Sequence, residues 1–129
     1  MACVLACALD ESTMGELNRL CSRLNLTVIR VDPKVYTCSL RDIVDGTTLL
    51  APPAGEIKME DPMMIMCGLT RREFDTLLDE LKQAHCRIRF KAVMTPTNKR
   101  WNIFQLHDEM VKEEAVFLAA RSADASQKP

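Results

Sequence analysis

Two apolar runs, each followed by an amphipathic segment, dominate the pattern of this chain. The first stretch reads VLACALDESTMGELNRLCSRLNLTVIRV and the second reads MIMCGLTRREFDTLLDELKQAHCRIRFKAV. Each opening run is apolar on both faces, which predicts a central strand covered on two sides, and the leucines that follow predict a helix with one apolar stripe. A second strand is predicted near 26–31 and 87–94. The pattern therefore predicts two β-α-β units, over about 3–31 and 62–94.

Three short sequences match the capping box that opens many helices. In such a box the side chain of a threonine or asparagine accepts a hydrogen bond from the backbone N–H of the third helical residue. That third residue is a glutamate or glutamine, and its side chain accepts a hydrogen bond from the backbone N–H of the capping residue. Each pair is expected to mark the first turn of a helix. The pairs are Thr13/Glu16, Thr70/Glu73 and Asn102/Gln105.

The segments outside the two units carry weaker signals. Residues 32–61 join the units, and the only helix predicted there is a short one over residues 40–44, capped by Ser39. After the second unit we expect a C-terminal helix over about 103–120 with apolar residues near one face. The small polar tail, 121–129, is expected to be disordered.

The polarity of the strands predicts their order in the sheet. Phe90 and Ala92 point one way while Arg89 and Lys91 point the other, as in an edge strand with one wet face. We therefore predict an α+β, ferredoxin-like fold, in which the opening strands of the two units are central and the closing strands lie outside. The alternative is a small α/β doubly wound sheet of four parallel strands, with residues 32–61 as a full crossover. The C-terminal helix or a second copy of the protein must cover the second face of the sheet.

Length and composition fit a single domain. The chain has 129 residues, of which 47% are hydrophobic and 27% charged, with a formal net charge of −1. This length suits one core, over residues 1–120. The start, MACVLACALDE, has no basic leader and is too short to span a membrane. We expect a soluble cytoplasmic protein, a homodimer, without membrane contact and without the charge that attracts nucleic acid.

The six cysteines are expected to be buried thiols. They lie in apolar runs, no C-x-x-C sequence occurs, and only two histidines are present, so neither a disulfide framework nor a metal or cofactor site is predicted. Cys7 and Cys67 hold similar places in the two units, each before a helix start, where a thiol pKa can fall. They are candidate reactive thiols, whose sulfurs would approach each other if the two strands were adjacent and parallel.

The stretch FKAVMTPTNKRW, residues 90–101, is the candidate binding site. One interpretation is structural: a strand ends at a proline turn, and the tryptophan anchors the turn on the core. The other is an anion site, in which hydroxyls, an amide side chain and the first N–H groups of the following helix converge on a phosphate or carboxylate beside basic residues. Its candidate residues are Lys91, Thr95, Thr97, Asn98, Arg100 and Trp101.

Other chemistry has less support in the sequence. The basic residues around this stretch suggest RNA binding as a further hypothesis. The central strands, however, carry no aromatic side chains on which bases could stack. His107, Asp108 and Glu109 are consecutive on a helix and point in different directions, which makes a poor metal or acid-base set. No catalytic residues are assigned, because no phosphate loop, H-E-x-x-H sequence or nucleophile elbow is present.

The second half of the chain resembles a bacterial family of uncharacterised small proteins, catalogued as domain of unknown function number three-seven-eight-three. The resemblance rests on a Pro-led apolar strand ending in Gly68, on the K-A-V-x-T-P-x-N-x-x-W sequence from Lys91 to Trp101, and on the acidic helix that follows. It implies no activity or cofactor. We therefore expect a non-catalytic binding or regulatory module for a small anionic ligand or a protein partner, with an enzyme acting on a small anionic metabolite as the alternative. RNA binding and thiol-redox chemistry are further alternatives with less support in the sequence.

Overall fold

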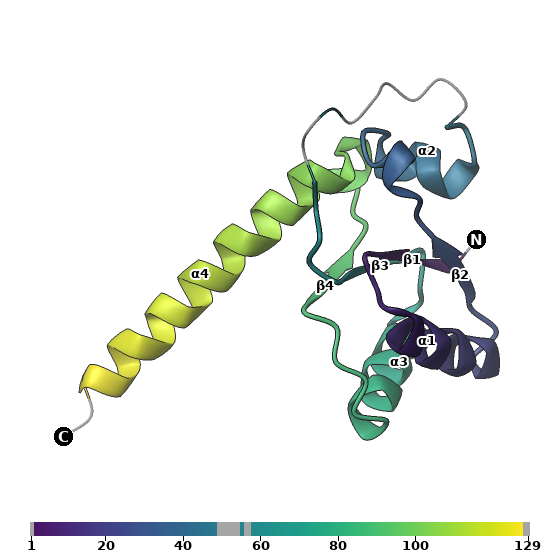
Figure 1. The fold of residues 1–129 in the computed structure, drawn as a ribbon. Coiled ribbons are helices and arrows are strands. Elements are labelled where there is room, and N and C mark those ends of the chain that lie inside the picture. Colours follow the sequence, from purple (N-terminus) through teal and green to yellow (C-terminus); the bar gives the residue numbers. More distant parts are fainter. Residues whose placement is uncertain (1, 49–54, 56–57, 128–129) are drawn as a thin grey trace.

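The computed structural model describes residues 2–48, 55 and 58–127 and places a four-stranded sheet between two layers of helices (Figure 1). The order of the strands across the sheet is β2-β1-β3-β4. The strands are β1 (Cys3–Cys7), β2 (Thr27–Arg30), β3 (Met63–Cys67) and β4 (Phe90–Val93). The helices are α1 (Glu11–Arg23), α2 (Leu40–Asp45), α3 (Arg71–Gln83) and α4 (Ile103–Gln127), with short 3-10 turns η1 (Pro33–Val35) and η2 (Asn98–Arg100).

The sheet is built from two β-α-β units that meet back to back. Strand β1 pairs in parallel with β2, and β3 pairs in parallel with β4, whereas β1 and β3 run antiparallel. The predicted positions, opening strands in the centre and closing strands at the edges, are confirmed. The ferredoxin-like class is not confirmed, because in that fold each β-α-β unit is split by a strand of the other. The alternative of four parallel strands is wrong, because the antiparallel β1–β3 pair excludes it.

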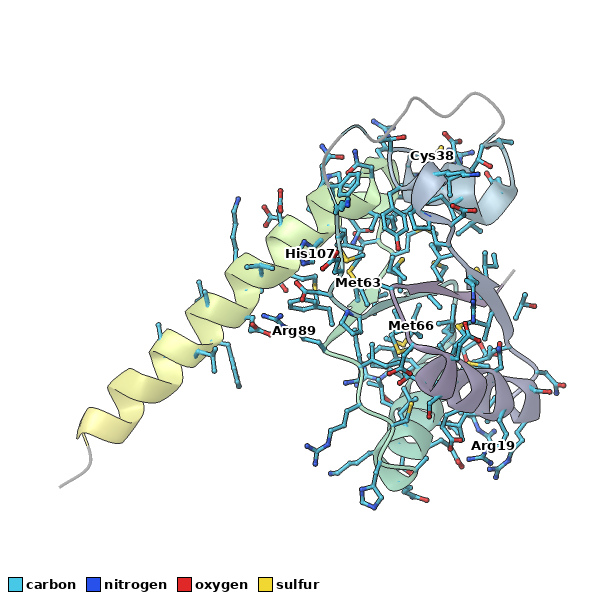
Figure 2. The ribbon with its side chains drawn as sticks, in the orientation of Figure 1. Arg19, Cys38, Met63, Met66, Arg89 and His107 are labelled. Carbon is cyan, nitrogen blue, oxygen red and sulfur yellow. The ribbon has the colours of Figure 1, made fainter. Side chains whose placement is uncertain are left out.

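Both faces of the central strands are buried, which explains why these strands are apolar throughout. Alternate side chains point to opposite faces, so Met66 packs under α1 and α3, while Met63 packs on the side of α2 and α4 (Figure 2). Ile103 and Leu106 in the first turns of α4 are buried in the core on the α2 and α4 side of the sheet. The C-terminal helix, together with α2, thus provides the cover that the sequence required.

Helix α1 starts earlier than the sequence predicts. Its N-cap is Asp10, whose carboxylate accepts the Thr13 amide at 2.7 Å. Thr13 is therefore inside the helix, and the predicted Thr13/Glu16 capping box is wrong. Glu16 instead forms an ion pair with Arg19 on the helix surface. An aspartate three residues upstream satisfies the same unpaired amides that the threonine would have satisfied.

The other predicted helix starts are confirmed. Thr70 and Glu73 form a complete capping box, with bonds of 2.8 and 3.1 Å between each side chain and the other residue's amide. Asn102 and Gln105 do the same at the start of α4, with both bonds at 2.9 Å. Ser39 caps α2 as expected, and its hydroxyl accepts the amide of the third helical residue at 3.1 Å.

Helix α4 begins on the sheet and then runs away from the body of the molecule (Figure 1). It ends at Gln127, so the helix predicted over 103–120 continues into the segment that was expected to be a disordered tail. Beyond its first turns it carries exposed apolar side chains, with Val116 and Leu118 70% and 52% exposed. In the described ranges no helix, α4 included, has the length and apolar character to cross a membrane.

Candidate binding groove at the edge of the sheet

Asn98 organises the turn that follows β4. It is buried, and its side-chain oxygen accepts the Thr95 amide at 2.7 Å, while its side-chain nitrogen donates to the Val93 carbonyl at 3.0 Å. The Thr95 hydroxyl accepts the Asn98 amide at 3.1 Å. The turn hydrogen bonds expected at this asparagine are therefore present. The same bonds commit the Asn98 amide group, which the anion hypothesis needed for a ligand.

The first amides of α4 are also occupied. Ile103 donates its N–H to the Tyr36 carbonyl at 3.1 Å, and Gln105 donates to the Asn102 side chain at 2.9 Å. Leu106 donates to the Asn102 carbonyl at 3.1 Å. An anion at a helix start is held by unpaired amides. Most of the amides that the anion hypothesis requires already have partners inside the protein.

A groove of about 340 Å³ nevertheless brings most of the predicted site together. One side is formed by the outer edge of β4 and the turn, and the other by α4, whose Glu109 and Glu113 face the same space. Arg100 does not line this groove and is exposed. The predicted residues that do line it are Lys91, Thr95, Thr97, Asn98 and Trp101.

The charges in the groove differ from those the sequence suggested. Lys91 donates from its ammonium to the Ile88 carbonyl at 3.1 Å, so part of its hydrogen-bonding capacity is used. Two carboxylates, those of Glu109 and Glu113, line the same groove as this single lysine. Neither glutamate was among the predicted site residues, although their spacing of four residues puts them on one face of the helix, beside the buried Leu106. The lining of the groove therefore combines two carboxylates with one ammonium group.

The backbone of β4 adds a second recognition element to the groove. Phe90 and Met94 donate their N–H groups to β3, to the carbonyls of Pro62 and Met66 at 3.1 and 2.9 Å. Because successive residues of a strand direct their backbone groups to opposite sides, Lys91 and Val93 direct theirs outward. Among the described residues no strand pairs with this outer side, and Asn98 satisfies only the Val93 carbonyl. The groove therefore offers the N–H of Val93 and both backbone groups of Lys91.

A cluster of four charged or polar side chains, here called the Asp61 cluster, attaches α4 to the sheet beside this groove. Asp61 accepts from His107 at 2.8 Å and from Arg89 at 3.0 Å, and Arg89 also donates to Glu114 at 3.0 Å. The hydrogen bond from His107, assisted by Arg89, lowers the pKa of Asp61. The partly buried His107 ring packs edge-on against Phe90, with ring centres 5.5 Å apart. Figure 2 shows His107 and Arg89 between α4 and the sheet. The cluster fixes the helix that forms one wall of the groove.

The Asp61 cluster draws its members from three separate parts of the chain. Asp61 precedes β3, Arg89 precedes β4, and His107 and Glu114 lie on α4. From the sequence, Arg89 was expected on the wet face of the edge strand, and His107 was set aside as one of three consecutive polar residues. The i, i+7 spacing of His107 and Glu114, on one face of the helix, is the only local signal that could have linked two members.

The candidate thiols are not brought together. Strands β1 and β3 are adjacent but antiparallel, so Cys67 lies opposite Cys3, and Cys7 lies opposite Met63. Burial raises the pKa of Cys7 to about 12. All six cysteines are free, and all except the partly exposed Cys86 are buried, as expected. Among the described residues no three histidine, cysteine or acidic side chains converge as a metal site.

The comparisons with known proteins identify one family. The model described as Domain of unknown function (DUF3783) matches residues 62–117, which confirms the resemblance found in the sequence. This segment runs from the start of β3 into α4 and includes every residue that lines the groove. No curated protein and no solved structure matches the chain.

Proposed function

We propose that this chain is a non-catalytic binding module that holds an extended, basic segment of a partner protein along the outer edge of β4. The observation that carries the proposal is the coincidence, in one groove, of an unpaired strand edge and two carboxylates on the facing helix. All lining residues fall within residues 62–117, the segment that matches the domain of unknown function.

The strand edge supports recognition through the backbone. An extended peptide can add a strand to an exposed sheet edge, where main-chain hydrogen bonds provide affinity and pockets for alternate side chains provide specificity. The outward groups of Lys91 and Val93 can form such bonds. The Asn98 bond to the Val93 carbonyl limits the added strand at one end, so the complementary segment is short.

The helix wall supports recognition through side chains. Glu109 and Glu113 lie one helical turn apart, and alternate residues of a bound strand would point toward them. Lysine or arginine at such positions would form ion pairs with both carboxylates. The intervening side chains would point to the opposite face of the sheet, where Val93 is 43% exposed and offers an apolar contact. The segment expected to bind is therefore one that alternates basic and apolar residues.

A titration followed by NMR tests this proposal. Labelled full-length protein is titrated with a six-residue peptide that alternates lysine and valine, and separately with its glutamate counterpart. We expect the lysine peptide to shift the amide signals of Lys91, Val93, Glu109 and Glu113. The glutamate peptide should shift them much less, and salt should weaken the lysine complex because exposed ion pairs are screened.

Variants separate the two contributions. Glu109→Gln combined with Glu113→Gln should weaken binding of the lysine peptide, whereas Asp108→Asn, a neighbouring exposed acid outside the groove, should not. Val93→Pro removes one outward N–H and leaves the bonds that Phe90 and Met94 donate to β3. It should weaken binding of both peptides, provided that the circular dichroism spectrum of the variant matches the wild type.

Two outcomes would contradict the proposal and point to the other candidates. Shifts produced by phosphate or citrate at Thr97 and Trp101, with none from the lysine peptide, would favour a small anionic ligand and reopen the enzyme alternative. A doubled mass in sedimentation, together with loss of that mass in Val93→Pro, would show that a second copy of this chain occupies the edge. The homodimer expected from the sequence would then be the occupant.

A further inference from the structure

Cys3 and Cys67 face each other at the centre of the sheet. They are direct partners in the antiparallel β1–β3 ladder, Cys3 at the start of β1 and Cys67 at the end of β3. Directly opposed residues in such a ladder have Cα atoms about 4.5–5.5 Å apart. Disulfides need about 4.4–6.8 Å between the same atoms. A bond between these two cysteines therefore requires no movement of the strands.

The two side chains also lie on the same face of the sheet. Both belong to the core under α2 and α4, and they are only 2% and 1% exposed. The Cys67 thiol donates to the Ile65 carbonyl at 3.6 Å. Its contact with Cys3 lowers the pKa of Cys3 to about 7, against the opposing effect of burial. The same contact raises the pKa of Cys67. Of the two sulfurs, Cys3 is therefore the one that loses its proton more easily.

Other cysteines lack this arrangement. Cys7 lies on the same face of β1, but its ladder partner is Met63, and burial raises its pKa to about 12. Burial likewise raises the pKa of Cys21 to about 11. Since the thiolate is the nucleophile in thiol oxidation, neither residue matches Cys3 in reactivity.

We propose that Cys3 and Cys67 form a dithiol site that a small hydroperoxide oxidises to a cross-strand disulfide. The Cys3 thiolate attacks one oxygen of hydrogen peroxide, the O–O bond breaks, and Cys3 becomes a sulfenic acid while hydroxide leaves and is protonated to water. The Cys67 sulfur then attacks the Cys3 sulfur. The S–S bond forms, the S–O bond breaks, and the Cys67 proton leaves with that oxygen as a second water molecule. Two thiols are oxidised and one peroxide is reduced.

The size of the oxidant follows from the burial of the pair. A bulky disulfide such as oxidised glutathione cannot reach sulfurs that are 1–2% exposed without unfolding the sheet, whereas hydrogen peroxide is close to water in size. The site is independent of the groove at β4, so loss of either property leaves the other intact.

Mass spectrometry of the folded full-length protein tests the proposal. After treatment with equimolar hydrogen peroxide, the thiols that can be alkylated in denaturant should fall from six to four. A tryptic digest without reductant should contain the peptide of residues 1–19 joined to that of residues 59–71. The first peptide carries both Cys3 and Cys7, so fragment ions that break the chain between them assign the bond in the wild type.

Matched variants give the control. Cys7→Ser should retain the cross-linked peptide and the rate of thiol loss. Cys3→Ser should lose both, and Cys67→Ser should leave Cys3 as a sulfenic acid, which dimedone captures once denaturant exposes the sulfur. The proposal is overturned if fragment ions place the bond at Cys7, if Cys21 and Cys86 are joined instead, or if all six thiols survive in the folded protein. The fragment-ion assignment holds even when a variant does not fold.

Discussion

Asn98 supplies, with one side chain, the hydrogen-bond partners that the backbone loses where β4 ends. Its side-chain nitrogen donates to the Val93 carbonyl, and its side-chain oxygen accepts from the Thr95 N–H. The turn buries this side chain. The sequence around it predicted a turn, and the turn is present. That Asn98 stabilises the turn from inside, with its amide committed, depends on distances that the sequence does not contain.

Replacing Asn98 measures this role. Asn98→Ala leaves the Val93 carbonyl and the Thr95 N–H without these partners in a partly buried turn, and should lower the free energy of unfolding by about 1–3 kcal/mol. Thr97→Ala changes an exposed neighbour whose side chain makes no capping bond, and should change it by less than about 0.5 kcal/mol. Urea denaturation of both variants gives the comparison. Equal effects would mean that water replaces the lost bonds and that Asn98 does not organise the turn.

Glu109 and Glu113 illustrate a limit of residue patterns, which do not say which elements meet in space. Glu109 and Glu113 have the right spacing for one helix face, but the sequence does not say which strand that face meets. Their position opposite Lys91 depends on the angle at which α4 crosses β4, and the Asp61 cluster contributes to that angle through Arg89 and His107. A site predicted from residues 90–101 alone therefore lacks its second wall and the two carboxylates on it.

At the level of elements, the two look-alike helices differ in how they begin. Thr70→Ala removes the cap of α3 and should lower the free energy of unfolding by about 1 kcal/mol. Thr13→Ala should leave it unchanged or raise it slightly, because Thr13 lies inside α1 and alanine has the higher helix propensity. Chemical denaturation compares the variants. A loss of similar size in Thr13→Ala would restore the capping role that the sequence suggested for Thr13.

Helix starts and strand positions were predictable to different degrees, for physical reasons. Polarity identified central and edge strands, because it reports directly how much water each strand meets. It could not give the direction of β1 relative to β3, since a strand buries the same side chains whichever way it runs. The direction decides whether Cys67 lies opposite Cys3 or Cys7. For α1, Asp10 and Thr13 are both good caps, and the sequence pattern does not choose between them.

At the scale of the whole molecule, the Asp61 cluster makes the attachment of α4 sensitive to acid. His107 and Arg89 hold the pKa of Asp61 below its usual value near 4, so the carboxylate stabilises the fold above about pH 5 and loses this effect as the pH falls through the folded pKa. The wild type should therefore be more stable than Asp61→Asn at about pH 6, and this difference should shrink toward about pH 3.

Urea denaturation of both proteins across this range measures the difference. Asp108→Asn, an exposed acid on the same helix that forms no ion pair within the described ranges, serves as the control and should show little change with pH relative to the wild type. A constant gap between wild type and Asp61→Asn from neutral pH to about pH 3 would show that the Asp61 charge does not hold the helix.

The antiparallel β1–β3 junction has a consequence for how such a chain could arise. Leu5 and Ile65 face each other at the middle of this junction, and a half-turn rotation about that point exchanges β1 with β3, β2 with β4 and α1 with α3. This is the symmetry of an isologous C2 pair. A peptide half as long, folding as one β-α-β unit with two parallel strands, would reach the same architecture by forming a dimer. The present sheet is what a tandem fusion of two such ancestral peptides would form.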